Sequence, residues 1–406
     1  MDTGNNAWIL TSTALVLFMT LPGLALFYAG MVRRKNVLST LMQSVGAAAI
    51  VTVLWALIAY SLAFSDGGGL NAFVGGLGRI GMAGIAPDTM SGDLPENLFL
   101  MFQLTFAIIT VAIIAGAAVE RIKFSAFMVF SAVWVVLVYA PICHWVWGGG
   151  FLGEAGVLDF AGGAVVHINA GVAGLVLAKF VGPRKGYPGS NLAPDNLVLT
   201  VAGAGILWVG WFGFNGGSAL TATDDASMAI INTHVAAATA ALVWVLVEKI
   251  AFGKATTVGF ATGAIAGLAT VTPAAGFISP GAAILFGILA ALVCYYAIQL
   301  VKTKLAIDDS LDVFAVHGVG GMLGSLLLGI FLSQELGGTG YAEGMTMAGM
   351  VGVQALGIAI VALFSAIVTA VIAIGVSLFI PMRVTEEEEV QGLDQTSHGE
   401  RSWQFD

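Results

Sequence analysis

The chain has 406 residues, of which 58% are hydrophobic and 10% are charged, against roughly 25% charged residues in an ordinary soluble domain. Its mean hydropathy is +0.94. A folded soluble domain must present a largely polar surface to water, so this composition excludes a soluble enzyme, a nucleic-acid-binding protein and a disordered protein as the main interpretation. The net charge of -9 indicates no particular partner, because four of the acidic residues are consecutive at 386–389.

Eleven apolar segments are long enough to cross a bilayer as helices, which takes about 20 residues each. No polar or proline-containing turn divides the last segment, so we expect one long, tilted helix there. In chain order the predicted spans are 8–31, 38–64, 97–118, 124–147, 160–181, 197–219, 227–247, 257–276, 281–301, 311–333 and 345–381.

The basic residues predict the orientation of these spans. With the N-terminus outside, fourteen of the fifteen Lys and Arg residues fall in cytoplasmic segments, and only Arg79 falls outside. An extra or missing span would scramble this alternation. We therefore expect a multi-pass protein of the cell (inner) membrane with a cytoplasmic C-terminus. Residues 1–7 lack the basic region of a signal peptide, so we expect the first span to be retained.

One motif occurs twice, 150 residues apart. Residues 159–177 (DFAGGAVVHINAGVAGLVL) match 309–327 (DSLDVFAVHGVGGMLGSLL) without gaps. The copies fall in the fifth and tenth spans, and a unit of five spans reverses direction when it is repeated. The pattern predicts an inverted five-plus-five repeat, which in many transporters places the site near the midplane between the halves. The matched pairs include Asp159 with Asp309, His167 with His317, Gly171 with Gly321, and Gly174 with Gly324.

This repeat predicts the domain organisation. A transmembrane domain is expected at 1–381, with repeat one at about 8–181, repeat two at about 197–333 and a final helix at 345–381. From 382 to 406 the chain is polar and acidic, which is typical of a cytoplasmic tail that buries little.

Pseudo-symmetry would bring His167 and His317 together near the centre of the bilayer. A histidine is costly there unless it is hydrogen-bonded. Two imidazoles can satisfy each other, one donating and one accepting, and such a pair forms a short proton wire. The glycines on the same face would allow the helices to touch. A packed pair with no transport role is the alternative, but ionisable groups inside a membrane usually mark function.

A metal site at this pair is less favoured, because two histidines without a third ligand leave the coordination incomplete. The two cysteines, Cys143 and Cys294, lie in apolar stretches and give no disulfide framework or metal-ligand spacing. We therefore expect no metal and no other cofactor.

Five motifs along the chain are specific in combination: LPGLALFYAGMVRRKN at 21–36, DFAGGAVVHINAG at 159–171, GWFGFNGGS at 210–218, DVFAVHGVGG at 312–321 and GLDQTSHGE at 392–400. With them the chain resembles the ammonium transporter family (Amt/Mep/Rh), and its bacterial Amt members most closely, from about residue 8 to 402. The resemblance implies an all-α polytopic membrane protein with eleven transmembrane helices, a homotrimer and one substrate pathway per subunit.

The resemblance also implies roles for individual residues. Trp147 in HWVWGGG, Phe102 and Phe106 in FQLTF, and Ser218 match an outer site that recruits ammonium. Phe106 and Phe214 match the stacked pair that closes the entrance.

Further in, His167 and His317 match the twin histidines of the pore, and Asp159 matches a buried carboxylate beside the entrance. Asp159 could bind the cation or brace the vestibule by accepting backbone N–H groups at a helix start, and its position favours bracing. For Asp309 and Asp312 a solvated or capping role is the better expectation. Below the phenylalanine pair we expect an apolar lining from Leu24, Ile113, Leu207 and Val313.

These residue types suit ammonium. Aromatic rings attract a small cation by roughly 0.5–2 kcal/mol each, and the Ser218 hydroxyl can accept one of its N–H bonds. Because an apolar lining penalises a full charge, we expect deprotonation before passage. Ammonia would then cross, and the proton would return outside or pass along the histidines. The sequence therefore predicts a transporter and no enzyme.

The resemblance further implies that the tail is an ordered segment across the cytoplasmic face of the trimer and that a PII-type signalling protein docks there. Loops bearing Arg33, Arg34, Lys185 and Lys249 would supply basic contacts to the tail or the partner.

Four other functions remain as alternatives. An aquaporin-type channel would need an Arg filter inside a span, and none is predicted. A sodium-coupled transporter would need unwound helices with several oxygen ligands. A membrane enzyme would need a metal at the histidine pair, and a pure sensor usually carries a larger signalling domain than residues 382–406.

Overall fold

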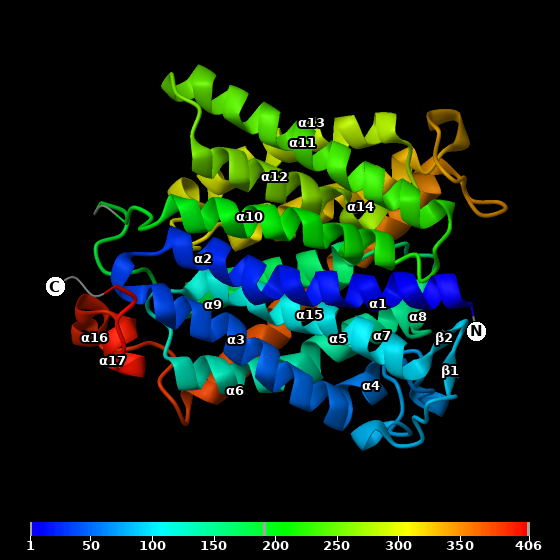
Figure 1. The fold of residues 1–406 in the computed structure, drawn as a ribbon, viewed down its shortest axis with the longest axis horizontal. Helices are drawn as coiled ribbons and strands as arrows, with labels where there is room; N and C mark the ends of the chain where they lie inside the picture. The colour runs from blue at the N-terminus through cyan, green and yellow to red at the C-terminus, as the bar shows by residue number, and fades with distance from the viewer. Residues whose placement is uncertain (1, 190–191, 404–406) are drawn as a thin grey trace.

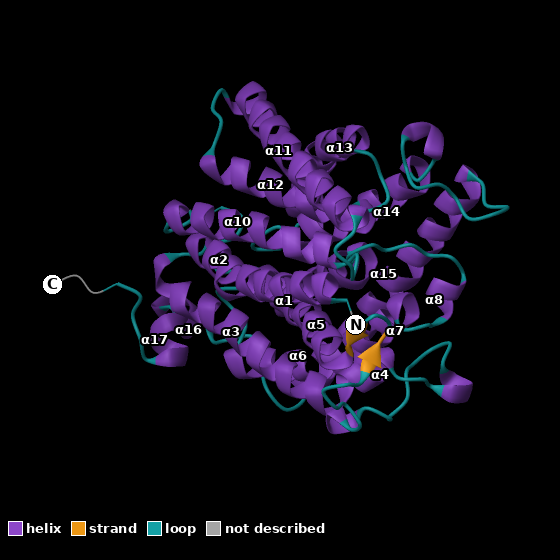
Figure 2. Ribbon diagram, turned by 45° about the vertical axis from the view of Figure 1, so that its right-hand side comes forward, coloured by secondary structure: helices purple, strands orange, loops and turns teal. Residues whose placement is uncertain are grey.

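The computed structural model describes residues 2–189 and 192–403. Its helices run roughly side by side in one bundle (Figure 1). Helix α1 begins at one end of the bundle, which we call the N-terminal end. Helices α16 and α17 lie at the opposite end, which we call the tail end. Figure 2 shows that the short β1–β2 hairpin is at the N-terminal end.

The first five spans are built from helices that several π-helical turns interrupt. They comprise α1 (Thr3–Phe18), η1 (Met19–Leu24), α2 (Ala25–Met31), η2 (Arg34–Asn36), α3 (Val37–Leu54), η3 (Trp55–Ala59), α4 (Tyr60–Phe64), α5 (Glu96–Ala118), α6 (Phe124–Trp134), η6 (Val135–Tyr139), α7 (Ala140–Trp147), α8 (Phe151–Glu154), η7 (Gly163–Ile168) and α9 (Asn169–Val181).

The next six spans and the tail continue the all-helical architecture. They comprise α10 (Leu197–Trp211), η8 (Phe212–Gly216), α11 (Asp224–Phe252), α12 (Thr257–Val271), η9 (Thr272–Ala274), α13 (Pro280–Gln299), η10 (Leu300–Lys304), η11 (Phe314–Val319), α14 (Gly320–Phe331), α15 (Met347–Ser377), α16 (Glu386–Gln391) and α17 (Leu393–His398).

Short elements fill the loops between the spans. The 65–95 loop contains the only strands of the described residues, which pair antiparallel with Met90 opposite Pro95. The 65–95 loop holds η4 (Gly68–Leu70), η5 (Ile80–Met82), β1 (Met90–Ser91) and β2 (Leu94–Pro95), and the loop before α15 holds η12 (Gln334–Leu336).

The predicted eleven spans are confirmed, because the described chain has 11 helices long and apolar enough to cross a membrane. The last is a single helix, Met347–Ser377, as expected. The largest shift in bounds is in the fourth span, which ends at Glu154 instead of 147. A glycine turn there leads into the short helix α8, which continues the span beyond the apolar run.

The core of the bundle is built around α5. Of its 23 residues, all but Asn97 and Met101 are buried, as expected for a helix surrounded by other helices. Spans one and six pack together through α2, η1 and α10, and spans five and ten pack through α9, η7, η11 and α14. These are the span pairs that the internal repeat relates to one another.

Glycines bring the two motif-bearing spans into contact. A Cβ on Gly171 would run into the backbone nitrogen of Gly318. A Cβ on Gly321 would lie 2.8 Å from the carbonyl oxygen of Gly163 and 3.0 Å from Cβ of His167. Only a residue without a side chain allows backbones to approach this closely, so the predicted close helix approach is confirmed.

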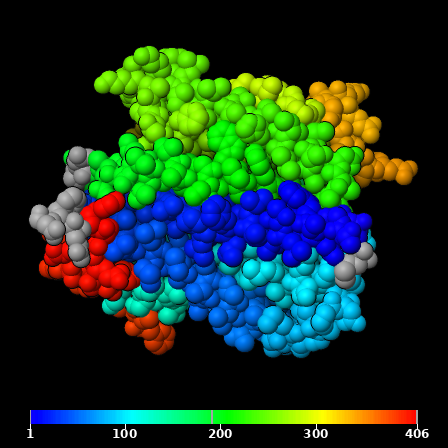
Figure 3. Space-filling model, viewed as in Figure 1, coloured from blue at the N-terminus to red at the C-terminus, as the bar shows by residue number. Residues whose placement is uncertain are grey.

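The tail differs from the expectation drawn from its composition. It forms α16 and α17, which pack against the tail end of the bundle (Figure 3). Leu393, Glu389 and Asp394 are buried there. The acidic run starts with a capping box, in which the Thr385 hydroxyl accepts from the Glu388 backbone N–H and the Glu388 carboxylate accepts from that of Thr385.

Candidate functional site

A chamber of about 420 Å³ lies toward the N-terminal end of the bundle. We call it the aromatic chamber, because six of its lining residues are Phe or Trp. Two carboxylates, Asp159 and Asp225, also face it. The lining residues are Phe64, Phe99, Gln103, Phe106, Val146, Trp147, Asp159, Phe160, Ser218, Ala219, Leu220, Asp225 and Phe277.

Two stacked phenylalanines close the inner side of this chamber. The ring centroids of Phe106 and Phe214 are 4.3 Å apart, with an angle of 27° between the ring planes. Trp147 meets the edge of Phe106 at 5.9 Å. Phe102 was expected in the chamber wall, but the structure places it behind Phe106, at 5.0 Å and edge-on, and it is not a lining residue. The two residues lie one turn apart on the same face of α5, so the packing around them, and not the helix geometry, leaves only Phe106 at the chamber.

The chamber offers hydrogen-bond acceptors. The Ser218 hydroxyl donates to the carbonyl of Phe214 at 2.8 Å, which leaves its oxygen lone pairs available. Gln103 is 8% exposed, and its Oε1 has no hydrogen-bond partner among the residues that the structure describes. A buried acceptor without a partner is costly, so this oxygen is suited to receive a donor from a bound molecule.

Asp159 supports the wall of the chamber. Its carboxylate accepts four backbone N–H groups at the start of η7, from Gly162, Gly163, Ala164 and Val165, at 2.6 to 3.1 Å. Its carbonyl accepts the indole N–H of Trp147 at 2.9 Å. One residue therefore anchors both the π-helical turn that carries His167 and the tryptophan of the chamber.

The two repeat-related histidines meet, as predicted. Their Nδ1 atoms are 3.1 Å apart, and their ring centroids are 5.2 Å apart and nearly parallel. His167 stacks on Trp211 at 5.5 Å and lies 6.0 Å from Phe214, which belongs to the closing pair. The Nε2 atom of His167 is buried and has no partner in the described part of the chain. Each histidine lies in a π-helical turn, a feature that is frequent at functional sites.

A second chamber, of about 310 Å³, reaches His317 from the tail end. We call it the exit chamber. Lys302 and Asp312 form an ion pair of 2.7 Å in its wall, and Arg184, Tyr28 and Tyr187 also line it. The closing phenylalanines, the histidine pair and this chamber therefore form one connected series of contacts.

The four residues expected to form an apolar lining are buried. Leu24, Ile113, Leu207 and Val313 are each at most 2% exposed. None of them lines either chamber, so a position along the route between the chambers stays a prediction. Leu24 lies in η1, Ile113 in α5 and Leu207 in α10, and Val313 directly precedes η11. The same segments carry or support the rings described above.

A buried ion cluster lies beside the exit chamber. Arg184 contacts Glu120 at 2.7 Å and Asp308 at 2.8 Å, and Arg33 contacts Glu120 at 2.8 Å. Burial alone would raise the pKa of Glu120, but Arg184 and Arg33 hold that pKa below its usual range. The cluster therefore fixes the loops at the tail end in one arrangement.

The tail is attached to these loops. Glu389 pairs with Arg383 at 2.7 Å and lies 4.0 Å from Arg33, and Lys185 pairs with Glu386. The carboxylate of Asp394 accepts the backbone N–H of Ser39 at 2.8 Å, at the start of α3.

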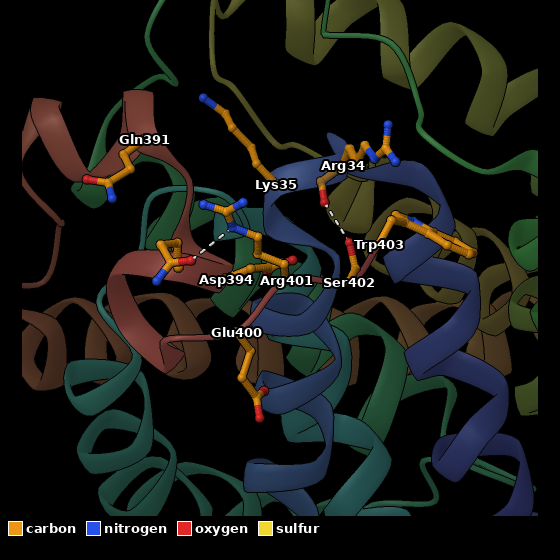
Figure 4. Close-up of a pocket in the computed structure, with 9 residues that line it drawn as sticks. Arg34, Lys35, Gln391, Asp394, Glu400, Arg401, Ser402 and Trp403 are labelled. Carbon is orange, nitrogen blue, oxygen red and sulfur yellow. Dashed lines mark hydrogen bonds between the residues drawn. The ribbon is translucent and has the colours of Figure 1, made fainter. Parts of the chain in front are cut away.

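A pocket beside this junction is drawn in Figure 4, in which Ser402 donates to the carbonyl of Arg34 at 3.1 Å. Arg33 and Lys185 thus contact the tail through their charged side chains, as expected, whereas Arg34 accepts this bond with its backbone carbonyl. Lys249 instead donates to the carbonyl of Gly253 at the end of its own helix, and its contact with a partner stays a prediction.

The sequence alone did not identify several residues of the site. Gln103 lies directly after Phe102 in a motif that the sequence had already marked. Phe64, Phe99, Phe160 and Phe277 line the chamber from four separate segments, and no periodicity connects them. Trp211, which supports the His167 ring, lies in the GWFGFNGGS motif and donates to the Thr272 hydroxyl at 2.9 Å.

These features define an all-helical, multi-pass membrane protein in which a buried histidine pair links two chambers, an architecture suited to transport. In the described part of the chain, no group of three or more His, Cys, Asp or Glu residues could hold a metal ion. The chain belongs to the ammonium transporter family, whose model (Ammonium Transporter Family) matches residues 7–403.

Individual relatives agree with this assignment. The chain is 48% identical over 408 residues to an ammonium transporter of Bacillus subtilis, with 100% of this chain and 99% of that protein covered. A solved structure titled Sensor Amt Protein matches with a TM-score of 0.90 and 29% identity, over 97% of this chain and 98% of that one. Mep2 of Saccharomyces cerevisiae matches with a TM-score of 0.85 and 37% identity, over 95% and 91%.

Proposed function

We propose that this chain transports ammonium across the membrane through the series formed by the aromatic chamber, the phenylalanine pair, the histidine pair and the exit chamber. The observation that supports this most strongly is the contact chain itself. Phe214 stacks on Phe106 at 4.3 Å and lies 6.0 Å from His167, which bonds His317 at the wall of the exit chamber.

Capture takes place in the aromatic chamber. The ring faces of Trp147 and Phe106 attract a cation, and the carboxylates of Asp159 and Asp225 lower the cost of holding one there. Ser218 and Gln103 supply oxygen acceptors for its N–H bonds. Potassium would gain the ring contacts but could donate no hydrogen bond, so the chamber favours ammonium.

Passage requires loss of charge. Beyond the phenylalanine pair the neighbours are Trp211, the histidine rings and buried aliphatic side chains, which penalise a full cation. Ammonia therefore crosses as a neutral molecule. The proton passes separately between the facing Nδ1 atoms of His167 and His317, where one ring donates and the other accepts. Asp159 acts as a brace that keeps Trp147 and the π-helical turn in place.

The charges support an orientation with the tail end in the cytoplasm. The tail end carries Arg33, Arg184, Lys185 and Arg383, and positive segments remain on the cytoplasmic side. The aromatic chamber then opens to the outside and the exit chamber to the cytoplasm, which is the direction of uptake.

The assembly is a homotrimer, as the family resemblance implies. In support, α11 and α13 expose large apolar side chains such as Leu242, Leu246, Leu285 and Tyr296, which need lipid or another subunit to cover them. Mass measurement of the detergent-solubilised protein, corrected for bound detergent, tests this. Three chains per particle support the trimer, and one chain per particle contradicts it.

A PII-type signalling protein docks at the tail end and blocks the exit chambers. The ordered tail and the basic loops beneath it would form the docking surface, and such charge-steered binding weakens with salt. Deleting residues 384–406 should leave an inserted protein with altered inhibition by the partner. Full transport with full inhibition after the deletion would show that the tail has no regulatory role.

The transport proposal is tested on purified protein in liposomes. Ammonium pulses should produce a saturable current and a change in internal pH that do not depend on sodium, whereas potassium pulses should produce neither. A signal that requires sodium would indicate a coupled transporter, and no signal would indicate a sensor. Both outcomes would contradict the proposal.

A further inference from the structure

Arg79 is the only Lys or Arg residue that the charge pattern places on the outer side, and the proposed route makes no use of it. The structure positions it at the N-terminal end, in the loop between the second and third spans. Its guanidinium donates two parallel hydrogen bonds to the carboxylate of Glu96, the first residue of α5: Nε to Oε1 at 2.8 Å and Nη2 to Oε2 at 2.9 Å. Such bidentate pairs are among the strongest charge-assisted hydrogen bonds.

The pair lies in a chamber of its own, which we call the side chamber. It has a volume of about 540 Å³ and shares Phe64, Phe99 and Trp147 with the aromatic chamber, so the two are neighbours. Tyr60, Asp66, Arg79 and Glu96 are among its other lining residues.

The chemistry of the side chamber is that of a cation site. It presents four aromatic side chains and two carboxylates, Asp66 and Glu96. The Tyr60 hydroxyl donates to Oε1 of Glu96 at 3.1 Å, which orients the carboxylate. Among the described residues that line it, Arg79 is the only basic one. Its guanidinium is bound to the carboxylate of Glu96, so the protein's own cation fills the position that a free cation would take.

The two partners differ in exposure. The side chain of Glu96 is 7% exposed and that of Arg79 is 33% exposed. A carboxylate this well buried needs a cationic partner, whereas the guanidinium approaches from the solvent side and can be exchanged. An ammonium ion, with four N–H donors, could supply the two bonds that Glu96 now receives from Arg79.

We infer that Arg79 sets the affinity of the outer entrance for cations, because it neutralises Glu96 and thereby blocks a second cation-binding position next to the aromatic chamber. This inference rests on the proposed ammonium transport. It predicts that capture becomes tighter when the arginine charge is removed, since an attractive carboxylate is uncovered and a repulsive charge is lost.

The test measures ammonium transport in liposomes for the wild type, Arg79→Met and Arg79→Lys. Arg79→Met should lower the half-saturating ammonium concentration about threefold at low ionic strength, and the shift should shrink as salt is added. Arg79→Lys keeps the charge and should stay near the wild-type value. Arg79→Gln, which retains donors for Glu96 without the charge, gives a second neutral variant if Arg79→Met does not insert.

Two controls identify the carboxylate as the ligand. Adding Glu96→Gln to Arg79→Met should abolish the gain in affinity. Free guanidinium is the group that the Arg79→Met substitution removes. At concentrations far below denaturing ones, it should inhibit ammonium transport by Arg79→Met and leave transport by the wild type unchanged.

An unchanged or raised half-saturating concentration in both neutral variants would overturn the inference and indicate that the ion pair only fixes the start of α5. A wild type without any ammonium signal would instead defeat the proposed function. The two failures are therefore distinguishable.

Discussion

The two copies of the repeated motif have similar sequences but different surroundings, and their carboxylates show this most clearly. Asp159 accepts four backbone N–H groups at the start of η7. Asp309, its counterpart, accepts the N–H of Phe314 at 2.8 Å, and its Oδ1 has no partner among the described residues. Burial and the nearby Asp312 raise the pKa of Asp309 to about 6.

The surroundings of the two histidines differ as well. His167 is enclosed by Trp211 and Phe214, whereas His317 lines the exit chamber together with Lys302 and Asp312. The repeat therefore supplies a symmetric backbone and a matched pair of rings. The residues around the two copies differ. In the first half they brace the wall of the aromatic chamber, and in the second half they line the polar exit chamber.

Replacing the two carboxylates tests this difference and should give the largest effect. Asp159→Ala leaves four N–H groups without their acceptor and should cost about 4 kcal/mol or more, with loss of ammonium transport. Asp309→Ala should cost about 1 kcal/mol. Thermal unfolding in detergent, followed by tryptophan fluorescence, measures both, and equal losses would show that the copies are equivalent.

Adding a methyl group to the glycine contact between the halves should have the next largest effect. In Gly171→Ala the new methyl group runs into the backbone of Gly318, so the histidine-bearing turns must separate, at a cost of about 2–3 kcal/mol. Transport should fall at least about tenfold, because the facing Nδ1 atoms lose contact.

Gly205 in α10 is the matched control for this substitution. Among the described residues, no atom outside the neighbouring residues and the backbone of its own helix lies within 4 Å of a Cβ placed there, so Gly205→Ala should be neutral or stabilising by up to about 1 kcal/mol. If Gly171→Ala behaved like this control, the close contact would have no importance for the pair.

The pH dependence of stability should reveal Asp309, with a smaller effect. Its folded-state pKa of about 6 exceeds the usual value of about 3.9, so the folded protein binds this proton more tightly than the unfolded chain. The resulting stabilisation is fully present below about pH 4 and is lost as the pH rises through about 6.

Asp309→Asn, which resembles the protonated acid, isolates this contribution. The difference in unfolding temperature between wild type and variant should shift against the wild type by a few degrees from pH 4 to pH 6.5. A constant difference over that range would contradict the assignment.

The sequence predicted the features that depend on long, repeated patterns. Eleven apolar runs and the charge alternation gave the spans, and the 150-residue offset gave the pairing of His167 with His317 and the glycine contacts beside them. These predictions succeeded because a membrane helix must be apolar throughout and because a repeat fixes which residues face each other.

The sequence could not predict which way a side chain points or which residues from distant segments meet in the chamber. Phe102 and Phe106 are one helical turn apart, and only packing decides that Phe106 faces the chamber. Gln103 reaches the chamber from α5 and Phe277 from the turn between η9 and α13, and these segments meet only in the folded protein. Composition did not predict the docking of the tail, because the docking depends on individual buried side chains within a polar segment, among them Glu389, Leu393 and Asp394.

The central claim is that ammonia and its proton separate at the phenylalanine pair and that the two histidines carry the proton. The most direct measurement records current and internal pH together after ammonium addition to liposomes containing wild type, His167→Leu or His317→Leu. Wild type should show a saturable current, and each single variant should lose the proton-carried current or lose selectivity against potassium. Wild-type currents with unchanged selectivity in both variants would contradict the account.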